Sequence, residues 1–248
     1  MATSISVESL LRAHFIAAHS ERMSAASSTV GAADRMAVRT WQQARLAATH
    51  ADLLKSPKYG PAATFFLTEL YSAADLTQRD ADIERVIKIL VKFLPDKALR
   101  TLAAALEMDA LSERMDRLMA AQLRAMQASN KPLSIDSESY GAGYRAMGEF
   151  DLRLRQIELT QEIGRALDKL SRLPLLRGLL RMMSGPAQIG GVGGLHAFLE
   201  RGYTAFAHMG SANDFIDAIV NQERAEHGRL AQVDQPRKPS AGSSVKWR

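Results

Sequence analysis

The segment Asp82–Pro95, DIERVIKILVKFLP, decides the fold class. Apolar side chains recur along it every three or four residues, which is the period of an α-helix with one buried face. These side chains are Ile83, Val86, Ile87, Leu90, Val91 and Leu94. Charged residues lie on the opposite side, namely Glu84, Arg85, Lys88 and Lys92, and a proline ends the pattern because its ring cannot continue a helix. The segment therefore predicts an amphipathic helix packed against other helices.

The same period continues in both directions along the chain. It predicts helices from Val7, over about 34–54, from Gly60-Pro61, from Asp96, around Leu111, over about 136–173, from Pro174, around Leu195 and around Phe215. The Ser/Ala/Gly-rich residues 24–33 are expected to form a linker, and 185–194 a glycine-rich hinge. We therefore expect an all-α fold, a single bundle of about nine to ten helices over residues 1–230.

The predicted helix over 136–173 changes its apolar side along its length. Tyr140 and Tyr144 lie on one side of it, whereas Ile163 lies on another. A helix that changes its apolar side packs against different neighbours at its two ends. This favours one interlocked bundle over two independent domains, with residues 127–137 as the best internal boundary.

The positive charge of the chain is concentrated at its C-terminus. The formal net charge is +5, and from Arg229 onward five basic residues and one acidic residue account for +4 of it. Residues 231–248 are rich in Pro, Ser and Gly, so we expect them to form a disordered basic tail. A nucleic-acid-binding face needs its excess charge on the folded surface. Nucleic acid is therefore not an expected partner, and binding through the tail is the last of the alternatives.

Several classes of chemistry lack their sequence signatures. The chain has no cysteine, which excludes disulfides, thiolate nucleophiles and iron–sulfur clusters and fits a reducing cytoplasm. The most apolar run, Leu173–Met183, is too short to span a membrane and contains two arginines. There is no phosphate loop, no H-E-x-x-H zinc motif, no G-x-S-x-G elbow and no E-x-x-H pair for a di-iron site. The sequence predicts no catalytic residue, no metal site and no cofactor.

Three polar residues occupy positions on predicted apolar faces. Glu69 falls between Phe65 and Phe66 on a helical projection, so its carboxylate must be paired or hydrogen-bonded if it is buried. His50 lies among leucines, and His14 occupies a similar position on the first helix. A buried histidine can ligate haem or a metal or act as a base, although most are hydrogen-bonded residues of the core. Glu69, His50 and His14 form the candidate buried polar site, with His50 as the candidate cofactor ligand.

The segment Phe65–Tyr71, FFLTELY, resembles the signature of a bacterial group named for an F-F-L-E-E-L-Y motif. The stretches RDADIERV, ALEMDALSERMD and FLERGYTAFAHMG are also similar to that group, and the resemblance covers residues 39 to 227. Thr68 departs from the motif, which has glutamate there, and helical geometry places this position on a solvated side. The resemblance implies a bacterial source and a helical fold, and it assigns no activity and no catalytic residue.

The sequence favours a non-enzymatic, cytoplasmic protein-interaction or regulatory module that binds a protein partner or forms a homo-oligomer and has no membrane partner. The alternative is a helical ligand-binding or haem-binding protein that uses His50 or His14. A third hypothesis is a hydrolase or lyase in which Glu69 and His50 form an acid–base pair, which requires hydrogen-bond reach between them.

Overall fold

The computed structural model describes residues 6–26, 28–70, 87, 91, 95–127, 131–173, 178 and 193–232. Within these residues it contains nine α-helices, one π-helical turn and no strand, which confirms the all-α fold. The α-helices are α1 (Val7–Ala26), α2 (Thr29–Thr49), α3 (Ala51–Lys55), α4 (Gly60–Phe65), α6 (Asp96–Met126), α7 (Ser137–Met147), α8 (Phe150–Ser171), α10 (Gly193–Met209) and α11 (Asn213–Ala231). The π-helical turn, η1, is Phe66–Leu70.

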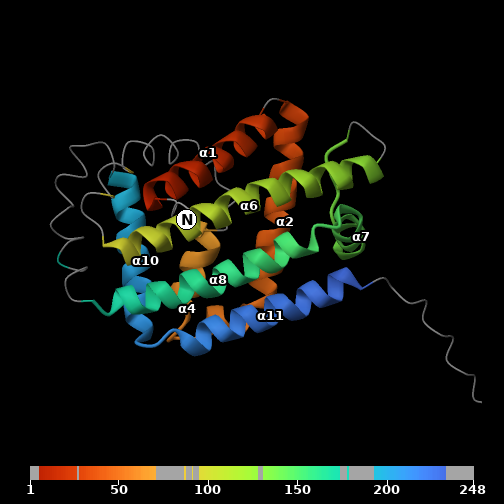
Figure 1. Ribbon diagram of the computed structural model, residues 1–248. Helices are drawn as coiled ribbons and strands as arrows, with labels where there is room; N and C mark the ends of the chain where they lie inside the picture. The colour runs from red at the N-terminus through yellow and green to blue at the C-terminus, as the bar shows by residue number, and fades with distance from the viewer. Residues whose placement is uncertain are drawn as a thin grey trace, which may run out of the picture.

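Four of the longer helices form one layer of the bundle. α1, α6, α8 and α11 lie side by side in that order, from the top to the bottom of Figure 1. α2 runs steeply across this layer and lies behind it in the same view, where it contacts α1 and α6. α4 and α10 pack against each other, and α10 also contacts α8. The result is a bundle in which α2 crosses the helices of the layer.

The apolar core consists of three clusters of buried side chains. The first joins α4, α8, α10 and α11, and in it the ring of Phe66 lies against those of Phe206 and Phe215. The second joins α1 to α6 through residues such as Leu11 and Leu106. The third lies where α2, α6, α7 and α11 meet. Each cluster draws on residues distant in sequence, so the described helices support one another.

Two predicted breaks in the N-terminal half are wrong. Residues 24–33 are not a linker, because α1 continues to Ala26 and α2 begins at Thr29. Ser28 caps α2, and its Oγ accepts a hydrogen bond from the backbone N–H of Gly31 at 2.9 Å. The helices predicted from Asp96 and around Leu111 are a single helix, α6, because nothing between them interrupts a run of strong helix formers.

The prediction of a single helix over 136–173 is also wrong, and the break that it missed explains why the apolar side changes along this segment. The helix ends at Gly148, which adopts the left-handed conformation with φ of 67°, a region that favours glycine. α7 and α8 are therefore separate helices, each with its own direction and its own buried side. The start of α7 was well indicated, since Asp136 accepts a hydrogen bond from the backbone N–H of Ser139 at 2.8 Å.

Several predictions lie mainly outside the described residues. The helix predicted over 82–95 is described only at Ile87, Val91 and Pro95; Ile87 and Val91 are helical, and Ile87 is fully buried. The helix predicted from Pro174, except Gly178, and most of the tail at 231–248 also lie outside them. Of the hinge predicted at 185–194, only Gly193 and Gly194 are described, and they belong to α10 instead. The predicted C-terminal helices are confirmed as α10 and α11, and Gly210 follows α10 with φ of 70°.

The contact between α8 and α11 depends on the small size of Gly164. A Cβ at this position would lie 2.9 Å from Cγ1 of Ile216, which is itself buried. We expect Gly164→Ala to lower the free energy of unfolding by about 1–2 kcal/mol, because overpacking outweighs the gain in helix propensity. Urea denaturation measures this effect. Ile216→Ala removes the approached carbons, so the double variant should lose less than the sum of the two single losses, and strict additivity would contradict the prediction.

Candidate functional site

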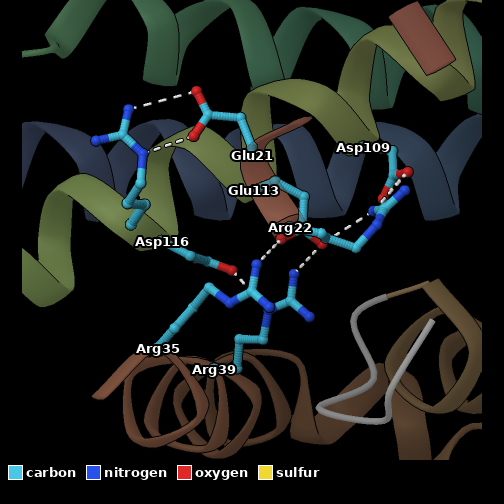
Figure 2. A network of polar contacts seen from close by, with 8 residues as sticks. Glu21, Arg22, Arg35, Arg39, Asp109, Glu113 and Asp116 are labelled. Carbon is cyan, nitrogen blue, oxygen red and sulfur yellow. Dashed lines mark hydrogen bonds and ion pairs between the residues drawn. The ribbon is translucent and has the colours of Figure 1, made fainter. Parts of the chain in front are cut away.

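A network of buried ion pairs lies at the junction of α1, α2 and α6. Its centre is Glu113 of α6, whose side chain is completely buried. Arg22 of α1 donates to Glu113 Oε1 at 3.1 Å, and Arg35 of α2 donates to Oε2 at 2.6 Å. Arg39 of α2 also donates to Oε1. Figure 2 shows the three guanidinium groups directed toward this one carboxylate.

Two further carboxylates of α6 balance the charge of the network. Asp109 accepts from Arg22 at 3.1 Å, and Asp116 accepts from Arg39 at 2.9 Å. Three guanidinium groups therefore face three carboxylates, and all six side chains are at most 16% exposed. This ionic core, defined as Arg22, Arg35, Arg39, Asp109, Glu113 and Asp116, fixes α1 and α2 to α6 through charged contacts (Figure 2).

The pKa shifts in the ionic core follow from burial and from the number of partners. Burial disfavours the charged form of Arg39, but Asp116 and Glu113 outweigh it and raise its pKa. Burial lowers the pKa of Arg35, and the attraction of Glu113 only partly opposes that effect. Burial also raises the pKa of Asp116 despite its contact with Arg39. Among the described residues, Arg35 forms an ion pair with Glu113 alone, so it is the arginine that depends most on this carboxylate.

The ionic core was not predicted from the sequence, although its residues follow a helical spacing. Asp109, Glu113 and Asp116 are separated by four and three residues, and Arg35 and Arg39 by four. Residues at these separations share one side of a helix. Charged residues along one side of a helix usually face solvent, so the helical spacing alone did not indicate that these residues are buried.

His50, the predicted candidate ligand, is buried at the junction of α2 and α3. Its Nδ1 lies 2.6 Å from Oε1 of Gln222, and its Nε2 lies 3.0 Å from Oε1 of Glu223. Arg45 donates to both oxygens of Glu223, at 2.6 and 2.8 Å. We call Arg45, His50, Gln222 and Glu223 the histidine cluster. It joins the C-terminal end of α2 to the middle of α11.

The charge of Glu223 determines which atom donates the hydrogen bond between His50 and Glu223. Burial alone would raise the pKa of Glu223, but hydrogen bonds from His50 and Arg45 and the charge of Arg45 lower it to about 2. Glu223 is therefore an ionised acceptor, so Nε2 of His50 must carry the proton of their hydrogen bond. Since Nδ1 also contacts a protein side chain, a metal or haem iron would have to displace one of these two contacts. Ligation by His50 stays a prediction.

Of the other two predicted site residues, only His14 has a described side chain. The side chain of Glu69 lies outside the described residues, although its backbone belongs to η1. His14 is half-buried on α1, whereas the side chains that contact the ring nitrogens of His50 both belong to α11. Thr68 is exposed, as the helical geometry of the FFLTELY segment predicted. No group of three or more potential metal ligands occurs among the described residues.

A second feature that the sequence did not reveal is an aromatic cluster beside the histidine cluster. The rings of Trp41 and Tyr140 stack with their centroids 3.9 Å apart. The hydroxyl of Tyr144 lies 2.6 Å from Nδ1 of His227. Burial raises the pKa of Tyr144 to about 12 even though Arg153 acts in the opposite direction, and burial and Arg153 both lower that of His227. The phenol is therefore the donor and the neutral imidazole the acceptor.

The comparisons with known proteins give a family. No described helix has the length and apolar character needed to cross a membrane. Searches of curated proteins and of solved structures gave no match. The model of one protein family, described as a domain of unknown function (DUF8198), matches residues 21–236, which include the ionic core, the histidine cluster and the aromatic cluster. Because this match covers most of the 248 residues, the chain belongs to the DUF8198 family.

Proposed function

We propose that this chain is a non-enzymatic, cytoplasmic protein-interaction module that pairs with a second copy of itself through the outward face of α1. The observation that carries the proposal is the composition of this face. Every described residue of α1 that is exposed is uncharged. These residues, which define the α1 face, are Ser9, Ala13, Ile16, Ala17, Ser20, Met23 and Ser24.

The α1 face differs from the usual outer side of a surface helix, which carries charged side chains. Ile16 is 64% exposed and Met23 is 54% exposed, and the two lie on the same side about two helical turns apart. The charged residues of α1 lie elsewhere. Glu21 and Arg22 face α6, where they pair with Arg117 and with the ionic core. Glu8 and Arg12 pair with each other near the start of α1, where their side chains are 43% and 35% exposed. The α1 face therefore leaves two large apolar side chains in solvent, and exposed charged side chains border it only at its N-terminal end.

A second copy of the chain suits this face. An uncharged face meets its own copy without like-charge repulsion, and a two-fold axis would let each copy contribute the same residues. In an antiparallel pair, Ile16 of each copy lies near Met23 of the other, and the Ala and Ser residues between them let the helices approach closely.

The ionic core also supports the proposal, because it fixes the helix that carries the α1 face. Arg22 holds α1 against α6 through Glu113 and Asp109, so α1 is fixed in place before any partner binds. A pre-organised surface loses less conformational entropy on association than a mobile one does. The two carboxylate oxygens of Glu113 both accept from arginines, an arrangement suited to a structural role.

The test is the mass of the full-length protein in solution. Sedimentation equilibrium of the wild type is expected to give twice the mass of one chain. The double variant Ile16→Glu/Met23→Glu is expected to give the mass of one chain, because it places like charges opposite each other across the two-fold axis. Its helical circular dichroism should be unchanged, since both side chains are exposed.

Leu154→Glu is the matched control. Leu154 is an exposed apolar residue, 37% accessible, but it lies on α8 rather than on α1. Its replacement should leave the dimer intact. A wild type that remains monomeric at its highest soluble concentration, or a dimer that survives the double substitution, would rule out pairing through the α1 face.

A further inference from the structure

A group of buried N–H donors lies beside the aromatic cluster. Nε2 of Gln42, Nε of Arg45, and both Nε and Nη2 of Arg153 are shut off from solvent and have no hydrogen-bond acceptor within the described part of the chain. A buried donor without an acceptor is costly, and native proteins rarely leave several together. Four such atoms on three side chains indicate that something outside the protein accepts from them.

The three side chains all act on one phenol, that of Tyr140. Burial raises the pKa of Tyr140, whereas the charges of Arg153 and Arg45 and the nearby amide of Gln42 act to lower it. Arg153 also lies 5.7 Å from the ring centroid of Tyr144. Gln42 and Arg45 come from α2, the tyrosines from α7 and Arg153 from α8. The unpaired donors therefore belong to one interior region rather than to separate defects.

The charge in this region is not balanced at contact distance. Arg45 donates to both oxygens of Glu223. Arg153 donates through Nη1 to the neutral amide oxygen of Gln156 at 2.8 Å, and it also interacts with the hydroxyl of Tyr144. Both partners are neutral, and among the described residues Arg153 forms no ion pair. Asp116 and Arg153 attract each other electrostatically, but the carboxylate of Asp116 is hydrogen-bonded to Arg39. One guanidinium charge is left without a contacting anion, which is costly in a protein interior.

The edge of Arg153 that lacks an acceptor is the one that binds carboxylates elsewhere in this protein. Nε and Nη2 of Arg155 donate to the two oxygens of Glu107 at 2.8 and 3.0 Å. The same edge holds a carboxylate in Arg117, Arg124 and Arg229. These two parallel N–H groups match the spacing of two carboxylate oxygens. Arg153 presents this edge in the interior without a protein acceptor.

We propose that the Nε/Nη2 edge of Arg153, assisted by Gln42 and Arg45, binds a small carboxylate ligand in the interior between α2, α7 and α8. The ligand carries one negative charge, which balances the guanidinium of Arg153. This site is distinct from the α1 face and does not depend on dimer formation.

Thermal unfolding of the full-length protein tests the proposal, with acetate as the probe and chloride at equal ionic strength as the reference. Saturating acetate is expected to raise the unfolding midpoint of the wild type by about 5 °C or more, because a ligand that binds only the native state stabilises it. Arg153→Gln should abolish the response to acetate. Inorganic phosphate forms a second arm, and a carboxylate site predicts a smaller rise with phosphate than with acetate.

Arg165→Gln is the matched control, since Arg165 lies on the same helix, is half-exposed and pairs with Asp217. This variant should respond to acetate as the wild type does. Equal midpoints of the wild type in acetate and in chloride would overturn the proposal, and a larger response to phosphate would overturn its assignment to a carboxylate. If Arg153→Gln does not fold, a crystal structure of the wild type grown in acetate decides: acetate on the Arg153 edge supports the site, and water alone on Nε and Nη2 overturns it.

Discussion

Replacing Glu113 by glutamine is expected to lower the free energy of unfolding by about 4 kcal/mol, a large share of the total stability of a domain. Glu113 is completely buried and accepts hydrogen bonds from three arginines. Glutamine keeps the shape of the side chain but removes its charge and one of its two acceptor oxygens. The ionic core would then hold three guanidinium groups and two carboxylates.

A compensating variant distinguishes lost charge balance from lost packing. Arg35→Met in the background of Glu113→Gln removes the guanidinium that, among the described residues, pairs with Glu113 alone. The core of the double variant is again neutral, with Arg22 and Arg39 facing Asp109 and Asp116. We expect it to recover about half of the lost stability, measured by urea denaturation.

Glu107→Gln is the matched control on the same helix. Glu107 pairs with Arg155, and both side chains are about one-third exposed, so its replacement should cost less than about 1 kcal/mol. If Glu107→Gln and Glu113→Gln lowered the free energy of unfolding equally, the burial of the ionic core would not make its ion pairs more important for stability than an exposed pair. A double variant less stable than Glu113→Gln would mean that Arg35 acts through its packing rather than through its charge.

The fold class followed from the sequence because a helix repeats locally. Apolar residues three or four positions apart identify a helix without knowledge of its partners, and α10 and α11 were found in this way. The positions at which helices end were harder to predict, because they depend on single residues. Gly148 ends α7 by adopting a left-handed conformation, and one glycine among many in a sequence does not reveal that it does so.

The candidate sites depended on contacts between distant segments, which periodicity does not reveal. The burial of His50 was predicted correctly, because its neighbours on the helix are leucines. Its partners Gln222 and Glu223 are more than 170 residues away, on α11. Glu113 was missed for a related reason: acidic residues on one side of a helix are normally solvated, and only the arginines of α1 and α2 make this side buried.

Glu223→Gln is expected to produce the second large loss of stability, and this loss should depend on pH. The pKa of Glu223 is about 2 in the folded protein, below its ordinary value of 4.5. Folding therefore favours the ionised form, which contributes up to about 3 kcal/mol at pH 7. This contribution is fully present above pH 4.5 and is lost as the pH falls from 4.5 to about 2. Urea denaturation of the wild type and the variant across this range measures it.

The difference between the two proteins is the informative quantity, since other carboxylates also become protonated in acid. The deficit of Glu223→Gln should be about 3 kcal/mol at pH 7 and should become small near pH 2, where the wild-type carboxyl is itself about half protonated. Asp217→Asn, which breaks a half-exposed pair on the same helix, should cost less than about 1 kcal/mol. A deficit of the same size at pH 7 and at pH 2 would show that Glu223 stabilises the protein through its shape, and that its charge does not tie His50 and Arg45 to α11.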